Sequence, residues 1–405
     1  MIQIRSEYPK SQIPIQPILS KESLGLFCRE APTSILNAGS SIMISSGTHA
    51  FALALQLAEI ASGDEVLVPA FNCPSMIEPI YWTTAKPVYI KIKHDLTLDL
   101  DDIEKKITTK SKAILAPYFF GFPQKMKALK ALCDAYNILL IEDCAHAYFG
   151  GTKGEPFGSY GDFAIASARK FFPCNDGGAL ISSTKEICNI KLVESHFGEN
   201  IKCLFNIFEE ALEYKRFPYA RYFIRIPIQM KNIIWGKLKT RRQRQESCDG
   251  SSSTQEHFVY MCPDTYMKKI SLPSKLVIHF ADKNRIICKR RTNYKKIVQE
   301  LCNIPNGKPL FMELTDDIVP YMVPFILEKP HLHFNKLKME GVPIWRWEES
   351  AIGYCANTDN YAFNLLQLPC HQELTHQEIT WMIDKIKKIL GNNINSNRGS
   401  HAVDM

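Results

Sequence analysis

Short apolar runs alternate with helical patterns along the first half of the chain. Runs rich in β-forming residues predict strands at residues 64–69, 86–92, 112–117, 138–143, 162–167 and 178–183. Apolar residues at helical spacing predict helices at residues 48–61, 100–107 and 124–137. Strands that alternate with helices are typical of βαβ units. We therefore predict an α/β fold with a mostly parallel sheet that is covered on both faces.

The pattern changes in the second half of the chain. From about residue 265 it becomes mainly helical, and a compact mixed α/β region is expected from about 308 to 391. The predicted divisions are a large domain over 1–265 with an insertion at about 200–260, a connecting helix and small C-terminal domain over 266–391, and a disordered polar tail over 392–405.

Composition is consistent with a cytoplasmic globular protein. The chain has 405 residues, of which 45% are hydrophobic and 22% are charged. Its thirteen cysteines contain no CxxC pair, which favours reduced thiols. We expect neither a secretory leader, because the first residues are not apolar, nor a membrane-spanning helix, because no sufficiently long apolar run occurs. No metal site is expected.

Lys170 is the leading candidate for chemistry. It ends the sequence Ser167-Ala-Arg-Lys170, which follows an apolar run and precedes Gly177-Gly178. A lysine desolvated at the end of a buried strand loses its proton more easily and becomes a nucleophile. A nearby hydroxyl and backbone amides suit a phosphate, so the pattern fits covalent binding of pyridoxal phosphate. Most lysines after a strand are solvated, so this interpretation depends on other residues.

Asp143 is the second candidate, because it ends the apolar run that starts at Ile138. Ligands of open α/β sheets bind beyond the carboxyl ends of the strands. A carboxylate there keeps a pyridine nitrogen protonated, and the ring then acts as an electron sink. The simpler alternative is a solvated acid at a strand end.

The third candidate is the sequence Ser45-Ser-Gly47-Thr48-His49, which precedes a strong helical pattern. We expect the helix to begin at about Thr48. Free amides at a helix N-terminus, with a glycine that allows close approach, form an anion site. An ordinary N-cap is the alternative, since serine and threonine favour that position.

The order of these motifs resembles the DegT/DnrJ/EryC1/StrS family of sugar aminotransferases, which use pyridoxal phosphate (PLP). The matching segments are 46–50 (SGTHA), 63–71 (GDEVLVPAF), 141–147 (IEDCAHA), 153–162 (KGEPFGSYGD), Lys170 with 176–178 (DGG), 290–294 (RRTNY) and 368–371 (LPCH). The resemblance covers roughly residues 35–390, apart from about 200–260. It implies the PLP-dependent transferase fold type I, with a seven-stranded sheet in the large domain, and a homodimer.

The resemblance also implies roles for individual residues. Lys170 matches the lysine that holds the cofactor, and Asp143 matches the partner of the pyridine nitrogen. Ser167, Gly47 and Thr48 match the phosphate-binding positions.

Some positions depart from the family pattern. His146 stands where the family usually has a glutamine that contacts the ring, and a structural histidine is the alternative. Cys73 replaces a stacking aromatic residue, so either Phe71 or His146 covers the cofactor ring or the affinity for the cofactor is lower. The serine-to-lysine spacing is two residues shorter than usual, and Arg169 is a further phosphate candidate. A partner-subunit asparagine is absent, and Lys269 is its candidate replacement.

A basic segment at residues 214–245 is the other unusual feature. It holds ten basic residues and no acidic residue, and without it 39 basic residues stand against 42 acidic ones. An apolar face at helical spacing within it suits contact with anionic lipid or with another protein. A solvated insertion is the alternative. No nucleic-acid partner is expected, because no binding motif accompanies the charge.

The resemblance implies an aminotransferase that moves an amino group from a donor, glutamate in the first place, to a keto sugar. A nucleotide-linked sugar in amino-sugar or surface-polysaccharide synthesis is the expected acceptor, and Trp345 and Arg346 are candidates for binding it. Packing of the two tryptophans, Trp345 and Trp347, in the core is the alternative. Two alternatives for function are an enzyme for a small keto acid and a catalytically impaired protein that binds a membrane or biosynthetic partner through 214–245.

Overall fold

The computed structural model describes residues 8–25, 32–217, 259–262 and 265–391. Most of the basic segment 214–245 and the whole tail 392–405 lie outside these ranges. The predictions of lipid or partner contact and of a disordered tail therefore concern residues outside the described part of the chain.

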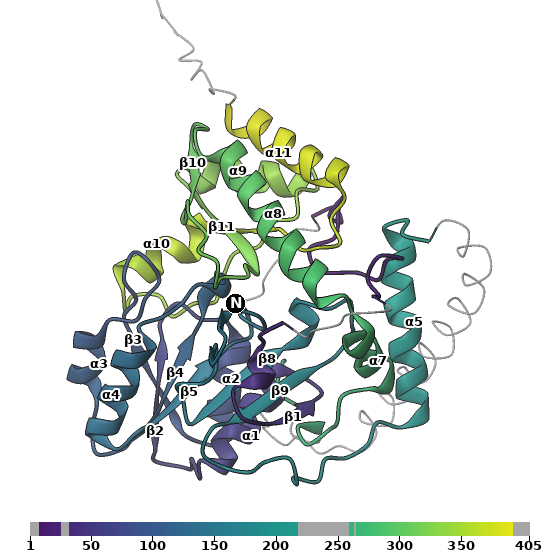
Figure 1. The fold of residues 1–405 in the computed structure, drawn as a ribbon. Helices are drawn as coiled ribbons and strands as arrows, with labels where there is room; N and C mark the ends of the chain where they lie inside the picture. Colours follow the sequence, from purple (N-terminus) through teal and green to yellow (C-terminus); the bar gives the residue numbers. More distant parts are fainter. Residues whose placement is uncertain (1–7, 26–31, 218–258, 263–264, 392–405) are drawn as a thin grey trace, which may run out of the picture.

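A seven-stranded sheet forms the centre of the molecule, with strand order β1-β9-β8-β5-β4-β2-β3 (Figure 1). Its strands are β1 (Ser40–Ile44), β2 (Glu65–Pro69), β3 (Lys86–Ile90), β4 (Ser111–Pro117), β5 (Leu139–Asp143), β8 (Phe163–Ser167) and β9 (Gly178–Ser182). The strands from β8 to β3 pair in parallel, and only β9 is antiparallel to its neighbours β1 and β8. The prediction of a mostly parallel sheet is confirmed.

Helices and short turns connect these strands. They are η1 (Ile35–Asn37), α1 (Gly47–Leu57), α2 (Pro74–Trp82), α3 (Leu100–Lys106), η2 (Phe119–Gly121), α4 (Met126–Tyr136) and η3 (Ala168–Lys170), with the small hairpin β6 (Gly151–Thr152) and β7 (Glu155–Pro156). The sequence pattern did not predict α2. Pro79 lies inside that helix, where proline removes a backbone hydrogen bond.

Both faces of the large sheet are buried, because alternate side chains of each strand point to opposite sides. Val66 of β2 and Leu115 of β4 join α1 and α2 in one apolar cluster. Leu67 and Ile114, one residue away, belong to the cluster that contains α3 and α4. The strands therefore read as continuous apolar runs, which is the pattern that predicted them.

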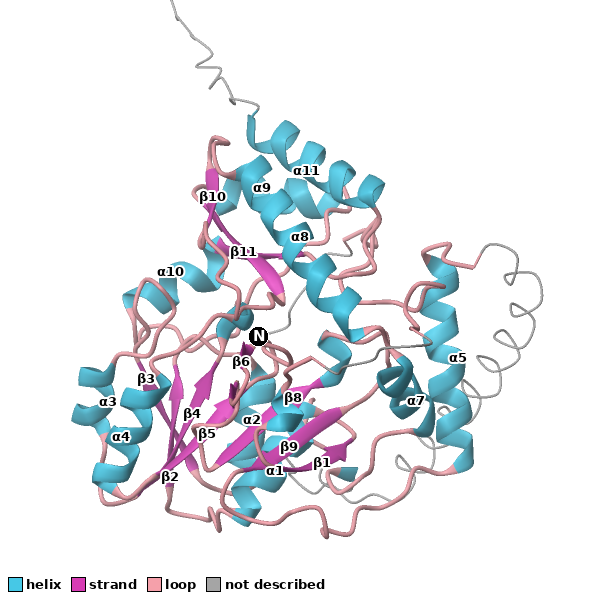
Figure 2. Cartoon of the chain, viewed as in Figure 1, coloured by secondary structure: helices cyan, strands magenta, loops and turns pink. Residues whose placement is uncertain are grey.

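The C-terminal part packs beside one end of this sheet (Figure 2). Its three-stranded antiparallel sheet has the order β10-β11-β12. The elements after β9 are α5 (Phe197–Glu213), α7 (Leu272–Phe280), α8 (Lys283–Leu301), β10 (Gly307–Pro309), β11 (Met322–Leu327), α9 (Pro330–Met339), α10 (Ala356–Asn364), β12 (Leu365–Pro369) and α11 (His376–Gly391). None of the helices in the described ranges is long and apolar enough to cross a membrane.

The N-terminal segment lies along the C-terminal part. The amide of Gln12 donates to the carbonyl oxygen of Gly341 at 2.9 Å. Nε2 of Gln16 donates to the hydroxyl of Tyr321 at 2.6 Å. The N-terminal residues Gln12 and Gln16 therefore contact the small C-terminal domain that the sequence predicts over 266–391. The predicted boundary near residue 265 stays a prediction.

Candidate active site

The candidate residues meet at one edge of the large sheet. β5 ends at Asp143 and β8 ends at Ser167, and these two strands run parallel. β1 has the same direction as β8, since both are antiparallel to β9. The residues that follow β1, Ser45 to Thr48, therefore reach the same edge. Parallel strands place their carboxyl ends together, which is where α/β sheets bind ligands.

Lys170 lies in η3, directly after β8, and is mostly buried. Burial lowers the pKa of its ammonium group below the usual value, and Arg169 lowers it further. The negative charge of Asp143 opposes this shift, and the Cys73 thiol, whose own pKa burial raises, also lies close to the amine. Burial in turn raises the pKa of Asp143, and Lys170 opposes that shift. The lysine and the carboxylate are therefore electrostatic neighbours in a desolvated site.

The carboxylate of Asp143 is fixed by the backbone that follows it. Its Oδ1 accepts a hydrogen bond from the amide of Ala145 at 2.8 Å. The side chain is 8% exposed. A buried carboxylate held in one orientation can act as the partner of a positively charged ring nitrogen.

The N-terminus of α1 lies against the end of β8, directly before residues 168–171, which we call the lysine turn. α1 begins at Gly47, and the side chain of Ser46 caps it by accepting from the amide of His49 at 3.1 Å. A Cβ atom added to Gly47 would lie 3.4 Å from the Cβ atom of Ser167. The amides at the start of α1 and the hydroxyl of Ser167 are therefore near one another, and both are suited to an anion.

Gly178 allows this close approach. A Cβ atom there would lie 2.2 Å from the backbone of Ser46, so no larger residue fits without movement. The preceding Gly177 has a φ of +127°, and its amide donates to the carbonyl oxygen of Ser45 at 2.7 Å. The glycine pair thus explains how the lysine turn and the helix start come together.

His146 is buried as a neutral imidazole. Its Nδ1 accepts a hydrogen bond from the amide of Phe120 at 3.1 Å, which places the ring proton on Nε2. Burial lowers its pKa well below the usual value, and Lys170 contributes in the same direction. One face of the ring stacks on Tyr321, with ring centroids 4.3 Å apart.

Tyr321 is a site residue that the sequence did not predict. It immediately precedes β11, and the centroid of its ring lies 5.4 Å from Nζ of Lys170. Its amide donates to the carbonyl oxygen of Phe120 at 2.9 Å. No local motif marks this tyrosine, because it reaches the lysine through the packing of the C-terminal part against the sheet.

Phe71 and Cys73 occupy different surroundings. Phe71 is 1% exposed and packs between Phe119 and Trp347, with centroid distances of 5.4 Å and 4.9 Å. Cys73 occupies the position before the first residue of α2, and its Sγ lies 3.0 Å from the hydroxyl of Ser75. Phe71 therefore belongs to the aromatic core behind the site, whereas Cys73 lies near Lys170.

The two candidates for substrate binding lie in the C-terminal part, where the backbone of Trp345 pairs with that of Gln367. Trp345 is 50% exposed. The guanidinium carbon of Arg346 lies 3.6 Å from the ring centroid of Phe334, and its Nε forms an ion pair with Glu348. Trp347 instead approaches the site, with its ring 5.7 Å from that of His146. The role of Trp345 and Arg346 stays a prediction.

Lys269 has partners within its own chain. Its Nζ lies 2.6 Å from the carboxylate of Glu194, and its amide donates to the carbonyl oxygen of Val193 at 2.9 Å. The proposed use of Lys269 in a partner subunit's site would require the ion pair to open.

Comparisons with known proteins show what the N-terminal half is similar to. Residues 30–205 match the sequence model of the DegT/DnrJ/EryC1/StrS aminotransferase family. A GDP-perosamine synthase of Escherichia coli O157:H7 is 33% identical over 147 residues, which are 36% of this chain and 40% of that protein. An L-glutamine:scyllo-inosose aminotransferase of Streptomyces griseus is 30% identical over 149 residues, which are 36% of this chain and 35% of that protein. The aligned region thus spans well under half of these relatives.

The fold match extends over nearly the whole chain. The crystal structure of the aminotransferase TlmJ from Streptoalloteichus hindustanus superposes with a TM-score of 0.63 at 17% identity, and covers 93% of this chain and 98% of that one. The predicted fold type I is confirmed. The resemblance to the aminotransferase family is confirmed over residues 30–205, and the relatives give no support to the non-catalytic alternative.

The residues at this edge fit pyridoxal phosphate. A buried lysine would supply the amine, and a buried carboxylate would supply the partner for the ring nitrogen. A glycine-containing helix start beside a serine would hold the phosphate, and Gly178 allows the backbone of Ser46 to approach closely.

Proposed function

We propose that this chain is a PLP-dependent aminotransferase that moves an amino group from an amino donor to a keto sugar. The observation that carries the proposal is the meeting of Lys170, Asp143 and the start of α1 at one sheet edge. The family match of residues 30–205 contains all three.

Each residue would have a distinct task in binding. The amides of Gly47 and Thr48 and the hydroxyl of Ser167 would hold the phosphate. Asp143 would pair with the pyridine nitrogen, and the cofactor when bound supplies an electron sink for the substrate carbon. The Nε2 proton of His146 is available to a ring substituent, because its Nδ1 is already used.

Lys170 would carry the proton between substrate and cofactor. Its lowered pKa places more of the amine in the neutral form at neutral pH than an exposed lysine would have. The thiol of Cys73 and the ring of Tyr321 lie near its amine and form largely apolar surface there. That surface would exclude water while the proton moves.

The substrates are proposed from the relatives. Glutamate is the donor that we expect, with glutamine as the alternative, because one relative is named for L-glutamine. A nucleotide-linked keto sugar is the expected acceptor, since a GDP-perosamine synthase is among the relatives. A cyclitol ketone is the second candidate, supported by the scyllo-inosose enzyme.

A second copy of the chain is the proposed partner. Leu272, Leu276 and Phe280 follow one another at four-residue spacing along α7, and each is 46–58% exposed. Such an apolar ridge favours burial against another surface. Sedimentation velocity tests the homodimer, and a monomer at micromolar concentration would argue against it.

We propose a cytoplasmic location, with contact of segment 214–245 to anionic membrane surfaces as an additional hypothesis. The ten basic residues of this segment support the membrane contact. The structure describes residues 214–217 of it. Co-sedimentation with phosphatidylserine vesicles tests it. Equal pelleting of the full chain and a variant that lacks 218–245 would contradict the contact.

The direct test of the function is amino transfer with candidate pairs. Purified protein with PLP, glutamate or glutamine, and a panel of nucleotide-linked keto sugars, cyclitol ketones and small keto acids is assayed by mass spectrometry. Amination of a sugar or cyclitol is expected. Amination of keto acids alone would replace the proposed acceptor.

A further inference from the structure

Arg290 is a fully buried guanidinium at the junction of three chain segments. It lies on α8 and is 0% exposed. Its Nη2 donates to the carbonyl oxygen of Lys170 at 2.6 Å. Its Nη1 donates to the carbonyl oxygens of Pro320 at 3.1 Å and Tyr321 at 3.0 Å. Its Nε donates to Oε1 of Gln372 at 3.0 Å. One side chain thus joins the lysine turn, the segment before β11 and the turn after β12.

Gln372 extends the same contact to the next residue of the lysine turn. Its Nε2 donates to the carbonyl oxygen of Phe171 at 2.8 Å. The guanidinium carbon of Arg290 lies 4.3 Å from the ring centroid of Phe171. Two consecutive carbonyl groups of the lysine turn are therefore held by side chains that belong to the C-terminal part.

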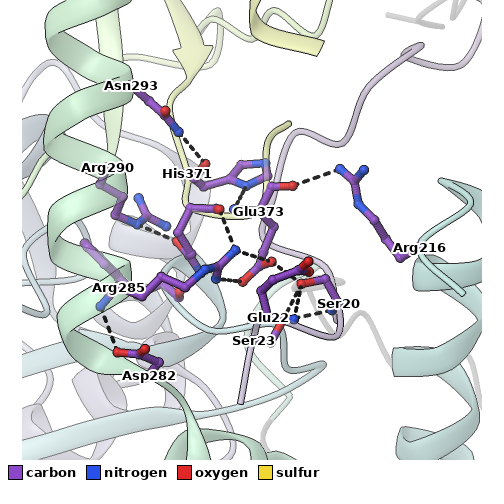
Figure 3. Close-up of polar contacts among 12 residues, drawn as sticks. Ser20, Glu22, Ser23, Arg216, Asp282, Arg285, Arg290, Asn293, His371 and Glu373 are labelled. Atoms are coloured by element: carbon purple, nitrogen blue, oxygen red, sulfur yellow. Dashed lines mark hydrogen bonds and ion pairs between the residues drawn. The ribbon is translucent and has the colours of Figure 1, made fainter. Parts of the chain in front are cut away.

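The hydrogen-bond acceptors of Arg290 are neutral. The nearby carboxylate of Glu373 is used by Arg285, at 2.8 Å, and by the hydroxyl of Ser20, at 2.6 Å. Figure 3 shows the two arginines on one helix, with Arg285 and Ser20 directed at Glu373. Burial lowers the pKa of Arg290 to about 10. Burying a cation without a bonded carboxylate lowers the stability of the fold. We therefore ascribe the role of Arg290 to the fixed geometry of its hydrogen-bond donors, which holds three chain segments together.

We propose that Arg290 is a positioning residue that fixes the lysine turn against Tyr321 and so holds the Lys170 amine in its buried place. One guanidinium bonds the backbone of both residues, and the Tyr321 ring lies 5.4 Å from Nζ of Lys170. The inference rests on the proposed function only in the assignment of Lys170 as the cofactor's lysine.

The test measures Lys170 in cofactor-free protein. Reductive methylation with formaldehyde is followed from pH 6 to pH 11 by peptide mass spectrometry, with the exposed Lys110 as an internal reference for the chemistry. Arg290→Lys keeps the charge but cannot span the same acceptors. We expect the midpoint of the Lys170 profile to rise by about one pH unit as the turn loosens and water enters.

Arg285→Lys is the matched control. Arg285 lies on the same helix and donates to the carbonyl oxygen of Gln372 at 3.0 Å, but it bonds neither Lys170 nor Tyr321. Its replacement is expected to lower stability without moving the Lys170 midpoint. If Arg290→Lys does not fold, the Lys170 profile is measured in Gln372→Met instead. This variant removes the hydrogen bond to the carbonyl oxygen of Phe171 and one acceptor of Arg290.

An unchanged Lys170 midpoint in the folded Arg290→Lys or Gln372→Met variant would overturn the proposal and leave Arg290 with a purely structural role. A midpoint that moves equally in Arg285→Lys would overturn it as well. Since no cofactor is present, these outcomes are independent of whether the chain transfers amino groups.

Discussion

The imidazole of His146 lies nearly flat against the ring of Tyr321, with their planes inclined by 24° and their centroids 4.3 Å apart. His146 follows the strand that ends in Asp143, whereas Tyr321 precedes the second strand of the small sheet. The stack therefore joins the two sheets beside Lys170. One face of the imidazole is therefore covered by the Tyr321 ring of the same chain.

Replacement of His146 by phenylalanine tests the hydrogen bond that accompanies this stack. His146→Phe keeps an aromatic ring but leaves the buried amide of Phe120 without its acceptor. We expect a loss of about 1–3 kcal/mol in the free energy of unfolding, measured with urea. The exposed His279 is the control, and His279→Phe should change stability by less than about 0.5 kcal/mol. Equal effects would contradict the assigned bond.

A methyl group at Gly178 should damage the cradle formed by α1 and the lysine turn. Gly178→Ala places a Cβ atom 2.2 Å from the backbone of Ser46. We expect a loss of at least about 1–3 kcal/mol in stability, together with weaker PLP binding in a fluorescence titration. Gly198→Ala, in a helix with no atom within 4 Å of the added Cβ, is the control. Unchanged PLP affinity in Gly178→Ala would mean that the cradle is elsewhere.

The ionised carboxylate of Asp143 should lower the free energy of unfolding of the cofactor-free protein at neutral pH. Burial raises its pKa above the unfolded value, so the protonated form stabilises the fold at low pH. That contribution is lost as the pH rises through the folded-state pKa. Asp143→Asn keeps an acceptor for Ala145 and should raise stability by about 1 kcal/mol at pH 7. The gain should vanish near pH 3, as measured by thermal unfolding, and a variant less stable at pH 7 would contradict the buried charge.

The neighbours of Lys170 should move its titration in opposite directions. Burial, with help from Arg169, lowers its pKa, while Asp143 raises it. In reductive methylation of cofactor-free protein, Arg169→Gln should shift the Lys170 profile to higher pH. Asp143→Asn should shift it to lower pH. Shifts of the same sign would show that the profile follows accessibility and not charge.

Local sequence was sufficient for the residues that follow strands. Asp143 and Ser167 end apolar runs, and Gly47 begins a helix, so strand ends and helix starts placed them at one edge. The long-range partners left no such signal. Tyr321 and Arg290 reach the lysine turn only because the C-terminal part packs against it.

The same limit explains the aromatic positions. The sequence offered Phe71 or His146 as a cover for the cofactor ring. In the structure Phe71 packs against Phe119 and Trp347, and its contact with a cofactor stays a prediction. Whether an aromatic side chain enters a site or the core depends on which distant residues surround it. The pair Trp345 and Trp347 illustrates this, since one is half exposed and the other is buried near His146.

The central claim is that Lys170 binds pyridoxal phosphate and serves amino transfer, and one absorption experiment tests it most directly. Purified protein is mixed with PLP, and the visible spectrum is recorded before and after addition of L-glutamate or L-glutamine, beside Lys170→Ala. We predict a yellow band for the wild type that survives gel filtration and fades with an amino donor. Lys170→Ala should lack that stable band. A wild type without the band, or a variant that behaves identically, would contradict the claim.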